Sequence, residues 1–126
     1  MIAIGEIRKT ITPYYDLQHG MMRTKSRPAL IIAKADSDDY VVLPISRITR
    51  QENRNEMYDI KVDPSSYPLL HLNAVSYIRT HKQTVIHQAE IGDLIGEIKS
   101  NYADLYLLVL ERREQFSGEI TNQALM

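Results

Sequence analysis

Two short apolar segments separated by a polar turn constrain the fold of this chain more than any other feature of its sequence. The first, residues 28–33, is a continuous apolar run of the kind found in a strand that is buried on both faces. The second, residues 40–45, follows a turn at residues 36–39 whose short polar side chains can hydrogen-bond to their own backbone. Residues 28–45 are therefore predicted to form a β-hairpin.

The segment before this hairpin is predicted to be one strand followed by a long loop. Residues 1–12 place isoleucines among polar side chains, and Pro13 is expected to end that strand because proline cannot donate to a β-ladder. Residues 14–26 contain Gly20 and several basic side chains and are expected to form a loop. This loop is longer than a typical connection, which indicates a functional or a mobile segment.

The segment after the hairpin is predicted to alternate between loops and strands. Residues 46–57 are polar and charged and are expected to form a second long loop, which could include a helical turn. Residues 58–62 alternate between apolar and polar side chains, as a half-buried strand does. A turn is expected at residues 64–68, and residues 74–86 are expected to be strand again.

From residue 91 the apolar residues follow helical spacing, so a long C-terminal helix is predicted to begin there. Asp93 suits the positive end of the helix dipole. Ser117 and Gly118 are expected to stop the helix and to leave a flexible tail at residues 117–126. The residues expected to share one helix face are Ile91, Leu94, Ile95, Ile98, Tyr102, Leu105 and Val109.

Three further leucines, Leu107, Leu108 and Leu110, make the apolar stripe of this helix wider than one barrel face should cover. Either the helix contacts a partner or a second copy of the chain, or its end is deeply buried. Both interpretations stay open. With 126 residues the chain can form one domain, which we place at residues 1–116. Several short strands followed by one helix predict a mainly β fold, a small closed barrel with a helix at one end.

Composition excludes some classes of site. There is no cysteine, so disulfides and thiolate metal sites are excluded, which fits a cytoplasmic protein. No segment is long and apolar enough to span a bilayer. The net charge is −1, but residues from 90 onward include seven acidic and three basic side chains, which leaves twelve basic and nine acidic before them, or +3. A basic face for phosphates is possible there. On this feature alone, ordinary mixed surface charge is the better interpretation.

Motifs for metal or nucleotide chemistry are missing from the sequence. His19, His71, His81 and His87 form no close pairs of the zinc-binding kind, and there is no HExxH. The five glycines form no phosphate-binding loop, and there is no GxSxG elbow. We therefore expect no metal and no cofactor.

Cationic and hydroxyl side chains stand at the predicted strand ends, in segments 25–27, 46–50 and 79–82, which the barrel could bring together. Such a cluster suits RNA cleavage in which the substrate's own 2′-hydroxyl attacks the adjacent phosphate. Arginine would stabilise the phosphorane, and a histidine or another perturbed group would transfer protons. The candidates are Arg23, Lys25, Arg27, Ser46, Arg47, Arg50, Arg79, Thr80, His81 and Lys82.

Each candidate also has a structural interpretation. Arg27 could form a salt bridge at the start of a strand, and Ser46 could cap a helical turn. Arg79 and Lys82 could be solvated strand charges. A histidine such as His81 is more often a surface or hydrogen-bonded structural residue than a catalyst.

At these same segments the chain resembles the MazF/PemK family of toxin endoribonucleases. The resemblance implies an SH3-like barrel of about five to seven strands closed by a C-terminal helix. It also implies a homodimer that cuts single-stranded RNA without a metal, and a small antitoxin protein that inhibits it. The matching pieces are Gly5-Glu6-Ile7, Arg27-Pro28-Ala29-Leu30-Ile31-Ile32, Leu43-Pro44-Ile45-Ser46, Ile78-Arg79-Thr80 and the helical close after Ile91.

The resemblance also assigns residues. The family's catalytic arginine falls on Arg27, its catalytic threonine or serine on Ser46, and its Arg-Thr pair near the RNA groove on Arg79 and Thr80. His81 is not a family hallmark and is a candidate acid or base from the residues alone. Lys25, Arg47, Arg50 and Lys82 complete the predicted RNA-binding set.

The chain departs from the family pattern at two places. Many members carry an acidic residue and a glycine before the arginine, where this chain has Met22 and residues 24–26. Some place an arginine and an aspartate before the Arg-Thr pair, where this chain has Ala74 and Ser76. An inactive member that binds nucleic acid, or a target-binding member like the gyrase inhibitors of this fold class, is therefore the alternative. A third interpretation is a dimeric scaffold that acts through the leucine-rich helix.

Overall fold

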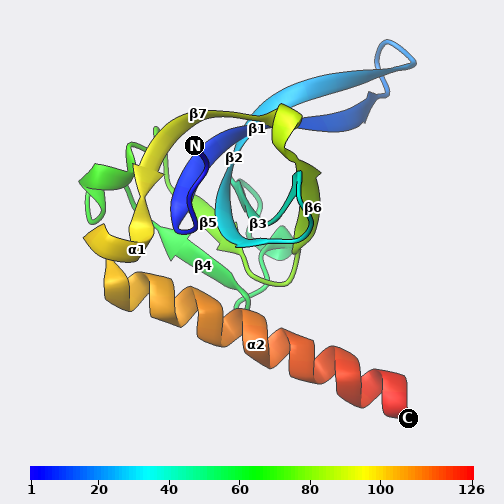
Figure 1. Cartoon of the computed structure of the whole chain (residues 1–126). Helices are drawn as coiled ribbons and strands as arrows, with labels where there is room; N and C mark the ends of the chain where they lie inside the picture. Colours follow the sequence, from blue (N-terminus) through cyan, green and yellow to red (C-terminus); the bar gives the residue numbers. More distant parts are fainter.

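The structure, a computed structural model, describes residues 1–126 as one curled antiparallel sheet with a long helix across it (Figure 1). The strands follow the order β4-β5-β3-β2-β1-β7, and β6 pairs with β3. This confirms the predicted mainly β fold with a C-terminal helix. The strands are β1 (Glu6–Asp16), β2 (Met21–Lys34), β3 (Asp39–Ser46), β4 (Asp59–Val62), β5 (Ser76–Arg79), β6 (Thr84–His87) and β7 (Ile91–Glu97).

The predicted hairpin is confirmed as β2 and β3, and it stands at the centre of the sheet. Both faces of β2 are buried at residues 29–31, where successive side chains point to opposite sides of the sheet. Leu30 belongs to the main core, whereas Ala29 and Ile31 belong to a second, smaller apolar cluster with Tyr40 and Val42. The continuous apolar run therefore fills two cores.

The predicted loop at residues 14–26 is wrong. Strands β1 and β2 stay paired without a register shift as far as Asp16 opposite Met21, so this segment is a β-hairpin arm that projects from the sheet (Figure 1). Pro13 does not end the strand. It lies beyond Thr10, the last residue of β1 that pairs with β7, so β1 is an edge strand there. A proline on an edge strand can lack its N–H without breaking a ladder on that side.

The loop and strand predictions between residues 46 and 86 are largely confirmed. Residues 46–57 contain one helical turn, η1 (Gln51–Asn53), and β4 follows. The predicted single strand at residues 74–86 is wrong in one respect, because a turn separates β5 from β6. Another helical turn, η2 (Pro68–Leu70), links β4 to β5.

The C-terminal helix begins later than predicted. Residues 91–97 form strand β7, which pairs with β1, and the helical part begins with α1 (Ile98–Asn101) and continues as α2 (Ala103–Leu125). The cap is the Glu97 carboxylate, which accepts from the backbone N–H groups of Lys99 and Ser100. Asp93 lies in the strand and has no part in the cap.

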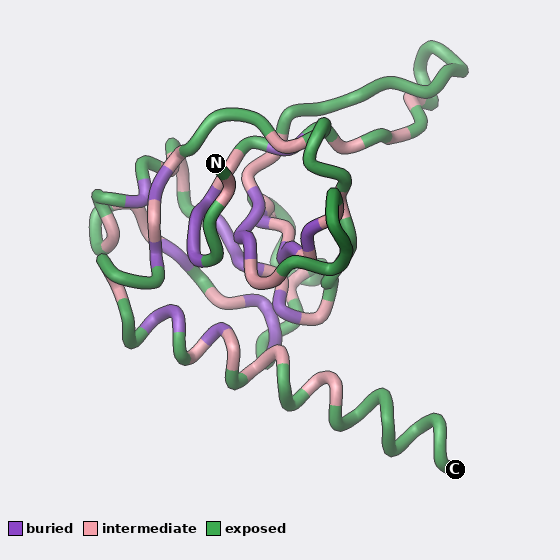
Figure 2. Tube along the Cα trace, viewed as in Figure 1, coloured by how far each residue is buried: buried purple, intermediate pink, exposed green.

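The predicted helix end at Ser117 and Gly118 is also wrong, since α2 continues to Leu125. The segment predicted to be a tail is therefore helical, and nearly all of it is exposed beyond the barrel (Figure 2). No helix of the structure has both the length and the apolar character needed to cross a membrane.

The first half of α2 closes the barrel. Leu105, Tyr106 and Val109 are buried in the main core. Leu107 is 62% exposed, which excludes the interpretation that all three additional leucines are deeply buried. The other members of this core are Ile7, Leu30, Leu43, Ile45, Val62, Leu70, Ile78 and Ile98.

Candidate functional site

The register of the central hairpin brings Arg27 and Ser46 together. Ala29 pairs with Pro44 in the antiparallel ladder of β2 and β3. The ladder ends at this pair. Continued by two residues, the same register would set Arg27 across from Ser46, and both side chains are partly exposed and line the same two cavities. Arg27 and Ser46, the two leading catalytic candidates from the sequence, therefore lie at the same end of the central hairpin.

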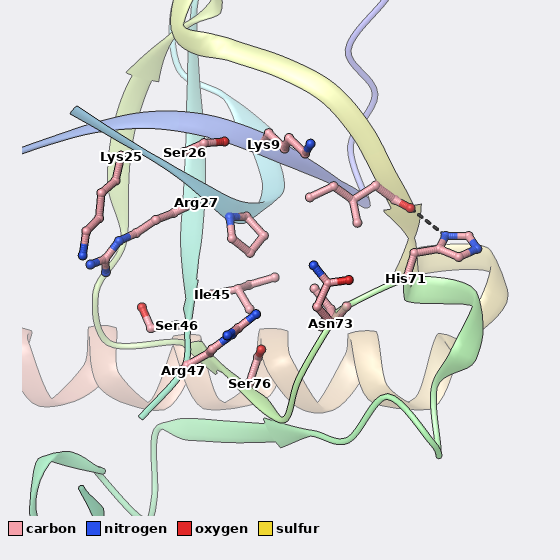
Figure 3. A pocket seen from close by; sticks show the side chains of 13 residues that line it. Lys9, Lys25, Ser26, Arg27, Ile45, Ser46, Arg47, His71, Asn73 and Ser76 are labelled. Atoms are coloured by element: carbon pink, nitrogen blue, oxygen red, sulfur yellow. Dashed lines mark hydrogen bonds between the residues drawn. The ribbon is translucent and has the colours of Figure 1, made fainter. Parts of the chain in front are cut away.

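A cavity of about 510 Å³ lies beyond the end of this ladder. Pro28 and Pro44 stand at the end of the ladder, and neither can donate a backbone hydrogen bond, so pairing stops there. Figure 3 shows Lys25 and Arg27 on one side of the cavity, Ser46 and Arg47 at the end of β3, and His71 and Asn73 on the opposite side. The cavity lining is Lys9, Lys25, Ser26, Arg27, Pro28, Ile45, Ser46, Arg47, His71, Leu72, Asn73, Ser76 and Ile95.

This first cavity is cationic. Two lysines and two arginines line it (Lys9, Lys25, Arg27 and Arg47), and no carboxylate does. Walls of one charge sign focus the field and raise the local concentration of ligands of opposite charge. Arginine in particular matches the oxygens of a phosphate with two parallel N–H donors. The cavity therefore suits a phosphate group next to Arg27 and Ser46.

A second cavity, of about 570 Å³, meets the first at Arg27, Pro28 and Ser46. It is lined by apolar side chains of β3 and β6 and by the cations Arg79 and Lys82. Glu90 is the one carboxylate on its walls. Arg27 and Ser46 thus stand between two hollows, which together could hold an extended polymer with its phosphate at their junction.

One wall of the first cavity was not predicted. His71 has a left-handed backbone conformation (φ 55°), which is uncommon for residues other than glycine. Its Nδ1 donates to the Ile95 carbonyl at 2.7 Å, which fixes the ring orientation. A Cβ at Gly96 would lie 2.8 Å from the Cα of Leu70, so only glycine lets β7 approach this closely. None of this has a sequence signature, so Lys9, His71, Asn73 and Ser76 were missed.

Arg79 is anchored by an internal carboxylate. Its Nε donates to Asp59 Oδ1 at 3.0 Å, and the side chain of Asp59 is fully buried. Asp59 also accepts from the backbone N–H of Asn55 at 2.8 Å. The Arg79 side chain remains 24% exposed and lines the second cavity, so it combines a structural contact with access to a ligand.

Three predicted residues lie elsewhere. Thr80 is 1% exposed, and its hydroxyl donates to the Tyr58 carbonyl at 2.6 Å, so we assign it a structural role in place of the expected RNA contact. His81 packs against the rings of Tyr58 and Phe116, which also contact each other, and it lines neither cavity. Burial lowers the pKa of His81, although nearby Asp59 opposes this shift. The exposed side chain of Arg50 precedes η1, outside both cavities.

Comparisons with known proteins agree with this geometry. The family model described as PemK-like, MazF-like toxin of type II toxin-antitoxin system matches residues 10–110. A search of the curated proteins found no match. Among solved structures, the fold is similar to that of the Mycobacterium tuberculosis toxin MazF-mt6, with a TM-score of 0.62 and 20% sequence identity over 90% of this chain and 96% of that chain. The resemblance drawn from the sequence motifs is thereby confirmed, and the chain belongs to the MazF/PemK-like toxin family of type II toxin–antitoxin systems.

Proposed function

We propose that the protein is a metal-independent, sequence-specific endoribonuclease that cleaves single-stranded RNA. The observation that carries this proposal is that Arg27 and Ser46 line one cationic cavity that no carboxylate lines. A phosphodiester bound there would meet donors on both strands. Membership of a toxin family supports the same conclusion.

Cleavage would proceed by attack of the 2′-oxygen on the adjacent phosphorus while the bond to the 5′-oxygen breaks. Arg27 would stabilise the charge that develops on the non-bridging oxygens, because fixed donors act most strongly where charge develops. Ser46 would orient the scissile phosphate through its hydroxyl. The products would carry a 2′,3′-cyclic phosphate and a 5′-hydroxyl.

Two protons must also move, from the 2′-hydroxyl and to the 5′-oxygen. Among the residues that line the two cavities, His71 supplies the one imidazole and Glu90 the one carboxylate, and both are side-chain types that serve as general acid or base. We propose these two as the acid–base candidates in place of His81, which lines neither cavity. Lys25, Arg47, Arg79 and Lys82 would hold the RNA backbone.

The partners follow from the family. We propose that a cognate antitoxin protein covers the cavities and inhibits cleavage, and that the protein acts as a homodimer in the cytoplasm. The exposed side chain of Leu107 on α2 supports an additional apolar contact.

The test is cleavage of a long single-stranded RNA by the purified protein in EDTA, with the fragment ends identified. Discrete fragments with 2′,3′-cyclic phosphate and 5′-hydroxyl ends support the proposal. Fragments that require an added divalent ion, or that carry 5′-phosphates, would contradict the mechanism. Absence of fragments with varied RNAs would favour the target-binding alternative.

A further inference from the structure

We propose that one face of the β1–β2 arm is a phosphate-binding track that extends the RNA site beyond the barrel. The inference rests on the proposed function, because it assigns additional RNA contacts to the same site. It concerns the arm, defined as residues 11–26, which projects from the sheet in Figure 1 and is largely exposed in Figure 2.

The register of the arm divides its side chains between two faces. Pairing between β1 and β2 is regular from Ile7 opposite Leu30 to Asp16 opposite Met21. Because side chains alternate along a strand, Arg23, Lys25 and Arg27 of β2 share one face. Their partners in β1 are Tyr14, Thr12 and Thr10.

The three cations form a row that leads to the site. Side chains two residues apart on a strand are separated by about 6.8 Å, a spacing comparable to that between neighbouring phosphates of an extended single strand. Lys25 and Arg27 both line the first cavity, and Figure 3 shows their side chains extending in the same direction. Arg23 continues the row outward and is 46% exposed. A strand with its scissile phosphate at Arg27 could place its next two phosphates at Lys25 and Arg23.

Interactions within the arm orient these side chains but leave them able to bind a phosphate. Arg23 Nε lies 3.2 Å from an Asp16 carboxylate oxygen, and Lys25 Nζ lies 5.0 Å from the centre of the Tyr14 ring. Ion pairs and cation–π interactions near the protein surface are weak. A phosphate can therefore compete for both cations. The Tyr14 ring adds a surface on which a base could stack.

The opposite face of the arm has no cation. It carries Ile11, Pro13 and Tyr15 of β1, opposite Ser26, Thr24 and Met22 of β2. Cations that served only solubility would be expected on both faces of the arm. Here they all lie on the face that includes Arg27. This asymmetry favours a polyanion running along one face.

The chain supplies a matched control at the other end of β2. Lys34 is exposed and makes a cation–π contact with Tyr40, with its Nζ 6.0 Å from the ring centre, just as Lys25 makes one with Tyr14. Unlike Lys25, Lys34 lies outside both cavities. Replacing Lys34 with alanine removes one cation and one cation–π interaction from the same strand without touching the track.

The test measures RNA affinity as a function of salt. For a single strand, the slope of log K against log salt falls in magnitude by about 0.7 for every phosphate that the protein no longer neutralises. The variant R23A/K25A should therefore have a slope smaller by about 1.4. A fourfold rise in salt should then weaken wild-type binding about sevenfold more than variant binding. K34A should keep the wild-type slope, and R23K/K25R, which keeps both charges, should restore it.

The probes are 2′-O-methylated RNAs, which lack the attacking hydroxyl, built around a cleavage site mapped on a long RNA. One probe covers only the site, and a longer one extends beyond it on both sides. The wild type should bind the longer probe more tightly, and R23A/K25A should lose this advantage while still binding the short probe. An unchanged slope and length advantage in R23A/K25A would overturn the track alone. Failure of the wild type to cleave or bind any RNA would overturn the proposed function and the track with it.

Discussion

The buried ion pair between Asp59 and Arg79 allows a quantitative test of the site's architecture. Asp59 has no exposed side-chain surface, whereas Arg79 is 24% exposed and faces the second cavity. Removing Arg79 leaves a buried carboxylate whose remaining partner within hydrogen-bond distance is the Asn55 backbone N–H. Removing Asp59 leaves an arginine that can turn toward water. Removing Arg79 should therefore destabilise the protein more than removing Asp59.

Breaking a buried ion pair by removing one partner costs about 3–5 kcal/mol. We expect R79A to lose about 3 kcal/mol of unfolding free energy, the lower value, because the hydrogen bond from Asn55 remains. The entropy of unfolding for 126 residues is about 0.26 kcal/mol/K near 60 °C, so the melting temperature should fall by about 11 °C. D59N should lose less unfolding free energy than R79A.

Denaturant and thermal unfolding of R79A, D59N and K82A measure these differences. Lys82 lines the same cavity but is exposed and has no side-chain partner, so K82A should keep the wild-type stability. A free energy of unfolding for R79A equal to that of K82A would refute this reasoning, and Arg79 would then be an ordinary surface charge.

Three further predictions concern pH, packing and proton transfer. Burial lowers the pKa of His81 below its ordinary 6.5, so the unfolded chain takes up a proton that the folded chain does not. Stability from this source is complete above about pH 6.5 and is lost as pH falls toward the folded pKa. The unfolding free energy of wild type should therefore fall more steeply than that of H81F between pH 7 and 5, and parallel slopes would exclude this contribution. G96A should lose about 1–3 kcal/mol, because a Cβ there meets the backbone of η2, and should slow cleavage by displacing His71. G118A, with no neighbour within 4 Å, should be as stable as wild type or more so in an unfolding assay, and equal effects of the two changes would contradict the role of close packing at Gly96. In pH–rate profiles of cleavage, H71Q or E90Q should remove one limb, and unchanged profiles in both variants would rule out this acid–base assignment.

The central hairpin was predictable because apolar runs and turn residues specify it locally. Once residues 28–45 form a hairpin with its turn at residues 36–39, antiparallel pairing must bring Arg27 toward Ser46. The catalytic candidates could therefore be named from sequence and family motifs alone, although their roles remain predictions.

The errors arose where a local signal had two interpretations. The spacing of Ile91, Leu94 and Ile95 fits a helix, but Gly92 and Gly96 disfavour one, and pairing with β1 makes the segment a strand. Pro13 is tolerated because it lies on an edge. Helix α2 continues through Gly118, because a glycine inside a helix costs only about 1 kcal/mol of stability relative to alanine.

The wall of the cavity opposite Arg27 could not have been predicted. It depends on the left-handed backbone of His71 and on contact between η2 and β7, which lie far apart in the sequence. His81 was the more prominent histidine because it follows a family motif. Its position against Phe116 is a long-range contact with α2 that local patterns do not encode.

The most direct test of the central claim is the single-turnover rate of cleavage at one mapped RNA site. Wild type, R27A and K34A would be compared under identical conditions. Loss of one preorganised donor to a developing anion costs about 10²–10³-fold in rate. A role for Arg27 at the phosphorane predicts a loss of this size for R27A and a near wild-type rate for K34A. Cleavage by R27A at the same site and at a rate close to that of wild type would contradict it.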